Sequence, residues 1–85
     1  MPKYLIESPH TAENCTLVIS EVHAMGYLEN FDWGCEAGVH CGWAIVELDS
    51  PDEGEMMVPS IVRSAARVVP LVKFGRARGK ELHGG

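Results

Sequence analysis

The stretch WGCEAGVHCGW, residues 33–43, decides the fold, because it joins two predicted strands through a turn centred on Gly38. Trp, Gly and Cys lead toward this glycine, and Cys, Gly and Trp lead away from it in mirrored order. Glycine readily adopts the positive φ that a tight turn requires. Alternating apolar residues precede the turn and a nearly apolar run, residues 43–48, follows it. The stretch therefore predicts a β-hairpin.

The register of this hairpin decides which side chains meet. If the two tryptophans face each other, the thiols of Cys35 and Cys41 lie opposite one another and close enough to oxidise. That register also places Glu47 on the same face as the aromatic residues. A shift by one residue instead places Cys35 beside His40 and keeps the buried face apolar. We expect this second register, with Cys41 facing away.

The segments on either side of the hairpin complete a βαββαβ pattern. Residues 3–7 form a β-prone run that a Ser-Pro pair ends. Residues 12–25 carry a helical apolar stripe between a threonine N-cap and a glycine. A second helix begins at Pro51, and Pro59 kinks it or ends its regular part. Residues 67–74 form the last strand, which its proline confines to an edge or a bulge.

This order predicts an α+β fold, a ferredoxin-like domain over residues 1–75, followed by a polar, frayed tail over residues 76–85. Right-handed crossovers place the first and third strands in the centre of a four-stranded antiparallel sheet. Two helices cover only one face of that sheet, although the central strands carry apolar residues on both faces. The second face would be covered most economically by another copy, sheet on sheet. We therefore expect a homodimer.

The net charge of the chain and the lack of long apolar runs limit the kinds of partner that it is expected to bind. The 85 residues carry a formal net charge of -5, which disfavours binding to nucleic acid or to anionic lipid. No apolar run approaches the roughly 20 residues that span a bilayer, and the N-terminus lacks the apolar core of a signal peptide. We expect a cytoplasmic protein, whose three cysteines stay reduced for packing, redox chemistry or metal binding.

Three segments resemble the dimeric α+β-barrel superfamily of ferredoxin-like domains, and within it a branch of short bacterial proteins of unassigned function. They are the opening YLIESPHT, the central WGC followed by GVHCGWAIVE, and the closing ARVVPLVKF. The resemblance covers about residues 2–74. It implies a two-fold dimer with a pocket between sheet and helices. The superfamily includes cofactor-free monooxygenases, small isomerases and metal-binding proteins, so the resemblance implies no single chemistry.

Four potential metal ligands would gather at one rim of the predicted sheet. The first two strands run toward the same end, where the first helix also begins. The residues brought there are His10, Cys15, Cys35 and His40. Thiolate and imidazole groups suit zinc, copper(I) or nickel, and no organic cofactor is expected. The C-x4-H-C spacing is no paired cysteine motif, so this prediction depends on the fold. The sequence thus predicts a metal-binding homodimer.

Two other classes of function stay open. One is a cofactor-free, isomerase-like or monooxygenase-like enzyme for a small apolar or carbonyl compound, with His10 or His40 as general base and Glu7 as its partner. The other is a non-catalytic interaction or regulatory dimer. In that case the cysteines only pack, as Cys15 in the apolar stripe of a helix would, because free cysteine is among the most buried residue types.

Overall fold

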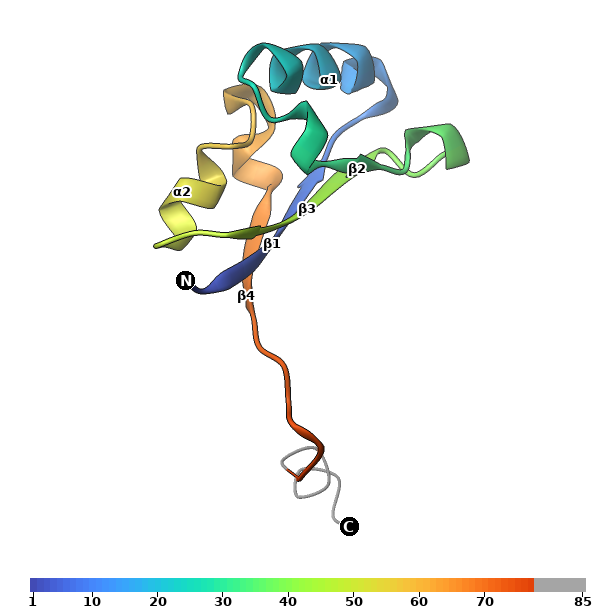
Figure 1. Cartoon of the computed structure of the whole chain (residues 1–85). Coiled ribbons are helices and arrows are strands. Elements are labelled where there is room, and N and C mark those ends of the chain that lie inside the picture. Colours follow the sequence, from blue (N-terminus) through green and yellow to red (C-terminus); the bar gives the residue numbers. More distant parts are fainter. Residues whose placement is uncertain (78–85) are drawn as a thin grey trace.

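Four antiparallel strands form one open sheet in the computed structural model, which describes residues 1–77 (Figure 1). The strands are β1 (Lys3–Pro9), β2 (Asp32–Trp33), β3 (Cys41–Glu47) and β4 (Arg67–Leu71). Their order is β2-β3-β1-β4, so β1 and β3 are central and β2 and β4 are edges. The predicted α+β class and antiparallel sheet are confirmed. The predicted tail lies mostly outside the described residues.

Helix α1 (Cys15–Ala24) is shorter than the predicted helix, because a 3₁₀ turn (Ala12–Asn14) precedes it and the predicted threonine cap stands before this turn. The Oγ1 of Thr11 accepts a hydrogen bond from the backbone N–H of Asn14 at 3.2 Å. Gly26, with φ of 88°, follows the helix. The threonine therefore fixes where the chain enters the helix that carries Cys15.

The second helix is shorter than predicted. Helix α2 (Pro51–Glu55) begins at its proline, as expected. It ends four residues before Pro59, whose extended backbone leads into a separate 3₁₀ helix (Ser60–Ala65). Proline lacks the N–H needed to continue a helical ladder, so the apolar residues after α2 pack from shorter turns. Two further 3₁₀ turns are Leu28–Asn30 and Cys35–Ala37.

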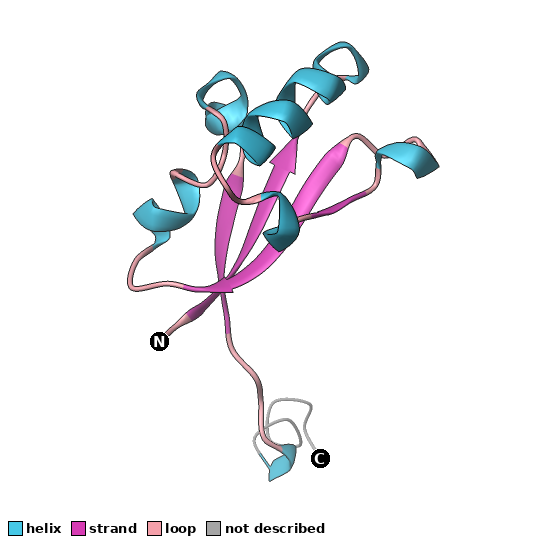
Figure 2. Ribbon diagram, turned by 45° about the horizontal axis from the view of Figure 1, so that its top comes forward, coloured by secondary structure: helices cyan, strands magenta, loops and turns pink. Residues whose placement is uncertain are grey.

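The helices lie on one face of the sheet, as Figure 2 shows. Ile6 of β1, Val18 and Val22 of α1, and Val58 after α2 are almost completely buried between these layers. Full burial of an aliphatic side chain contributes about 1.5–3 kcal/mol to stability. This face is the hydrophobic core.

The hairpin adopts the predicted second register. Trp33 pairs with Gly42 and Asp32 with Trp43. However, β2 is only two residues long, and Cys35 begins a 3₁₀ turn instead of ending the strand. The N–H of Gly34 donates to the carbonyl of Cys41 at 3.0 Å. After Gly34 the N–H groups of Ala37 and Gly38 donate to the carbonyls of Gly34 and Cys35, so the chain forms a turn instead of continuing the strand.

The mirrored Trp-Gly pairs serve packing across the hairpin. Trp33 lies over Gly42, since a Cβ built on that glycine would be 2.7 Å from the indole ring. A Cβ on Gly34 would lie 2.7 Å from the Val39 carbonyl oxygen and 3.0 Å from the ring of Trp43. Both glycines therefore allow a close approach that any larger side chain would prevent.

The outer face of the sheet is uncovered in the described part of the chain. Ile45 is 62% exposed there, and Leu5 and Val69 are paired neighbours on the central strand and edge strand. Glu7 lies on the same face and accepts hydrogen bonds from Trp43 and Arg67. No helix within residues 1–77 is long and apolar enough to cross a membrane.

Candidate metal centre

Four side chains from separate elements converge at the rim where the hairpin turns. The potential ligand atoms of His10, Cys15, Cys35 and His40 all lie within 4.8 Å of one another. His10 follows β1, Cys15 is the first residue of α1, Cys35 begins the 3₁₀ turn, and His40 directly precedes β3. All four are partly buried. The atoms lie close enough together to hold a metal ion.

Backbone hydrogen bonds fix the positions of these side chains. The N–H of His10 donates to the carbonyl of His40 at 3.0 Å and so extends the β1–β3 ladder by one pair. The N–H of Gly38 donates to the carbonyl of Cys35 at 3.0 Å, which closes the turn between the two hairpin ligands. The positive φ of Gly38, 84°, permits this closure. The site thus rests on the sheet and its turn.

The spacing within the group is near that of a tetrahedral centre. The Sγ of Cys35 lies 3.4 Å from the Nε2 of His10, and the rings of His10 and His40 have centroids 5.7 Å apart. Zinc–sulfur and zinc–nitrogen bonds of about 2.3 and 2.0 Å separate neighbouring ligand atoms by roughly 3.3–3.8 Å. Ligand atoms as far apart as 4.8 Å would therefore have to move only a short way toward an ion to reach these separations.

The environment favours a neutral His10 imidazole and a protonated Cys15 thiol before metal binds. Burial lowers the pKa of His10, and the neighbouring His40 acts in the same direction, against the opposing effect of the Ser8 backbone. The pKa of Cys15 is raised, first by a hydrogen bond with Cys35 and then by burial. Neutral imidazole has a lone pair free for a metal, whereas a thiol must first lose its proton.

Several buried polar atoms around the centre have no partner among residues 1–77. They include the Nδ1 atoms of His10 and His40 and the hydroxyl of Ser8. Leaving such groups unsatisfied is costly, and an ion coordinated through a histidine Nδ1 would satisfy that atom, whereas the Ser8 hydroxyl lies outside the group of four ligands. Ser8 was not predicted as part of this region. Ser8 is two residues before His10, and alternate residues of a strand share a face. Extending the alternation of β1 past Glu7 would therefore have placed Ser8 on the same face as His10.

Glu7 and Cys41 lie outside the group of four potential ligands. Glu7 accepts hydrogen bonds from the indole Nε1 of Trp43 at 3.4 Å and from the Nε of Arg67 at 3.1 Å. It occupies the outer face, so the predicted pairing of Glu7 with a histidine base does not form. Cys41 is buried, and burial and the nearby Glu7 raise the pKa of its thiol. The pairing of Trp33 with Gly42 confirms the predicted register, and Cys41 is not among the four converging ligands.

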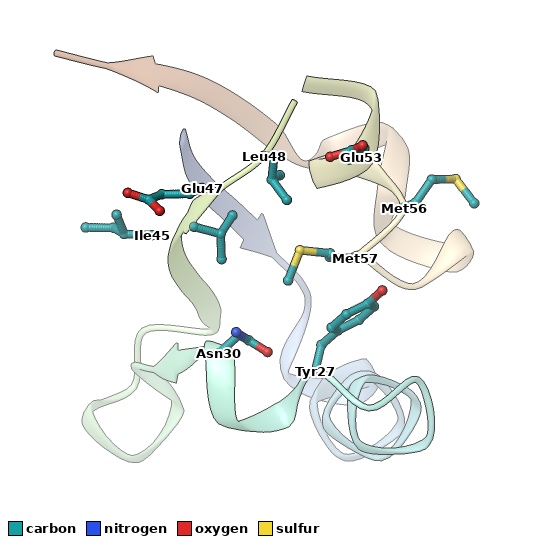
Figure 3. Close-up of a pocket in the computed structure, with 9 residues that line it drawn as sticks. Tyr27, Asn30, Ile45, Glu47, Leu48, Glu53, Met56 and Met57 are labelled. Carbon is teal, nitrogen blue, oxygen red and sulfur yellow. The ribbon is translucent and has the colours of Figure 1, made fainter. Parts of the chain in front are cut away.

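Among the cavities lined by residues of the described part, the one that touches His10 does not enclose the histidine pair. This cavity, of about 350 Å³, touches His10 and Asn14 and extends to Ile61 and Ser64, without reaching His40. The larger cavity, of about 630 Å³, lies beside the last residues of β3 and α2 (Figure 3). The convergence of ligand atoms is therefore the chemical feature that distinguishes this rim.

Comparisons with protein-family models, with curated proteins and with solved structures find no match to this chain. Membership of the dimeric α+β-barrel superfamily consequently stays a prediction.

Proposed function

We propose that this protein binds one transition-metal ion per chain through His10, Cys15, Cys35 and His40. The observation that carries the proposal is the approach of all four ligand atoms to within 4.8 Å of one another. They come from four elements separated by up to 30 residues, and backbone hydrogen bonds of the sheet hold two of them.

Charge and ligand type favour zinc, with copper(I) and nickel as the other candidates. Two thiolates balance the charge of a divalent ion, so a partly buried His₂Cys₂ centre would carry no net charge. Zinc prefers the tetrahedral arrangement of nitrogen and sulfur ligands that this group approaches, whereas thiolates also suit copper(I). Carboxylate-preferring ions such as magnesium find no oxygen ligand within the group.

Four protein ligands favour a closed centre that holds its metal rather than a catalytic one. Catalytic zinc sites usually keep one position for water or substrate, and closed sites contribute to folding. Here an ion would join the end of β1, the start of α1 and the hairpin turn. Metal binding would therefore stabilise the rim by linking these three segments through one ion.

The test is metal analysis of protein purified without a histidine tag, since a tag would itself bind metal. We expect one ion per chain in the original protein and much less than one in Cys35→Ser and His40→Ala. The matched controls are Cys41→Ala, a thiol on the other face, and His23→Ala, an exposed histidine of α1. Both controls should retain the full metal content.

Cobalt(II) substitution reports the geometry independently of the native metal. A tetrahedral centre with two thiolates should give intense visible d–d bands and sulfur-to-cobalt charge transfer, and Cys15→Ser should weaken the charge-transfer band. Substoichiometric metal in every sample, or equal loss in the ligand and control variants, would contradict the proposal.

We also propose that the chain acts as a cytoplasmic homodimer in which the outer faces of two sheets pack together. The exposed Ile45 beside Leu5 and Val69 supports this arrangement, because a small sheet with apolar residues on both faces needs a second cover. The order of strands and helices is compatible with the dimeric α+β-barrel superfamily. Sedimentation of the full chain tests the dimer, and Ile45→Asp should shift the protein toward monomer.

A further inference from the structure

The outer edge of β3 has no strand beside it after Trp43. Strand β2 pairs only with Gly42 and Trp43, and no other strand within residues 1–77 lies along that edge. The N–H of Leu48 donates to Pro2 and the carbonyl of His40 accepts from His10, so even-numbered residues of β3 bond toward β1. In an antiparallel ladder the alternate residues bond to the opposite side. The backbone groups of Ile45 and Glu47 therefore point toward the open edge.

An apolar cavity of about 630 Å³ adjoins this open edge. In Figure 3, Leu48 and Met57 point toward each other across it, and the ring of Tyr27 closes another side. Glu47 and Glu53 supply carboxylates to its lining. The lining contains no lysine or arginine. An occupant of this edge should combine apolar side chains with a positive charge.

The chain itself carries a segment of that kind after β4. Residues 72–76, which we call the arm, continue beyond Leu71 and leave the body of the domain (Figure 1). Val72 is 75% exposed and Phe74 is 52% exposed, and they alternate with Lys73 in the sequence. Arg76, at the end of the arm, is also exposed.

We propose that the arm of a second copy adds as a strand to the open edge of β3. In this pairing Lys73 lies beside Glu47 on the outer face. Because successive side chains of a strand alternate between faces, Val72 and Phe74 then lie on the side of the cavity. The arm thus supplies backbone groups that pair with the open edge, apolar side chains beside the cavity and a positive charge beside Glu47. This inference rests on the homodimer proposed above, but not on the metal centre.

Nuclear magnetic resonance of the full chain, prepared as a mixture of carbon-13-labelled and unlabelled copies, tests the contact directly. We expect isotope-filtered Overhauser effects between the methyl groups of Val72 in one copy and those of Leu48 or Met57 in another. Amide exchange of Ile45 and Glu47 should slow as protein concentration rises. Exchange of Ala44 and Val46 should be slow at every concentration, since these amides bond within the chain.

A charge exchange tests the register of the arm. Glu47→Lys alone and Lys73→Glu alone should each weaken the dimer by about 1.5- to 5-fold, the range of a cross-strand charge pair. The double variant should recover most of the loss. Glu13→Lys, which makes the same charge change on the exposed turn before α1, should leave dimerisation unchanged.

The outcomes separate the two proposals. A dimer that lacks contacts from Val72 and shows no recovery in the double variant would overturn the arm exchange and leave sheet-to-sheet pairing intact. A chain that stays monomeric at millimolar concentration would overturn both. Metal content measured on the same samples reports independently on the metal centre.

Discussion

Gly42→Ala should destabilise the hairpin, because the indole ring of Trp33 already fills the space beside this glycine. The new Cβ would lie 2.7 Å from Cζ3 and 2.9 Å from Cε3 of the indole, distances well inside van der Waals contact. The ring has little room to retreat, since its centroid lies 5.6 Å from the ring of Phe31 and 6.0 Å from that of His10. The substitution therefore forces a shift of packed aromatic groups next to His10, a residue of the proposed metal centre.

Overpacking of this kind costs about 1–3 kcal/mol. For a domain of this size each kcal/mol lowers the melting temperature by about 4–8 °C, so we expect a fall of roughly 4–24 °C. Thermal unfolding in the presence of a chelator measures the effect without metal. Ser20→Ala, at an exposed position of α1, is the control, and it should change stability by less than about 0.5 kcal/mol.

A double variant shows whether the indole causes the loss. Trp33→Leu removes the ring, and in that background Gly42→Ala should cost less than half of its cost in the original protein. If Gly42→Ala is as stable as the original protein, or if its cost is the same with and without Trp33, the packing argument is wrong.

Three further results are expected. Zinc at 100 times its dissociation constant should stabilise the protein against urea by about 2.7 kcal/mol and should do little for Cys35→Ser; equal stabilisation of both would contradict specific binding. Zinc binding at pH 7 should release at least one proton, because the raised pKa of Cys15 keeps its thiol protonated before the metal binds. Calorimetry in buffers of different ionisation enthalpy measures this release, and the affinity for zinc should increase with pH. Binding without proton release would exclude Cys15 as a ligand. Thr11→Ala removes the hydrogen bond that caps the turn before α1 and should lower stability by about 1 kcal/mol, whereas an unchanged urea midpoint would show that the cap contributes little.

Features set by local chemistry could be predicted from the sequence. Thr11 and Gly26 mark the ends of the first helical segment, and Pro51 marks the start of the second. The hairpin register was also predictable, because only one pairing keeps Glu47 away from the buried face. In each case a short-range rule or a burial requirement excludes the alternatives.

Features that depend on competing contacts could not be predicted. Alternation of apolar residues suggested a strand through Cys35, but Gly34 approaches Val39 so closely that the chain turns into a 3₁₀ helix first. The partner of Glu7 was also mispredicted. Its neighbours in sequence lie near the histidines, whereas its side chain points to the outer face, where Trp43 and Arg67 reach it. Period-two alternation separates sequence neighbours by the thickness of the sheet.

The same alternation explains why the mirrored stretch around Gly38 produces an asymmetric site. Cys35 and Cys41 are equivalent in the sequence pattern, but the pairing of Trp33 with Gly42 offsets the two arms by one residue. This offset brings Cys35 and His40 to the rim and turns Cys41 to the opposite face, where it is buried. A hairpin with the tryptophans face to face would favour a disulfide between its own arms. The observed register instead lets the Cys35 thiol meet His10 and Cys15, so packing of the Trp-Gly pair determines which thiol joins the proposed metal site.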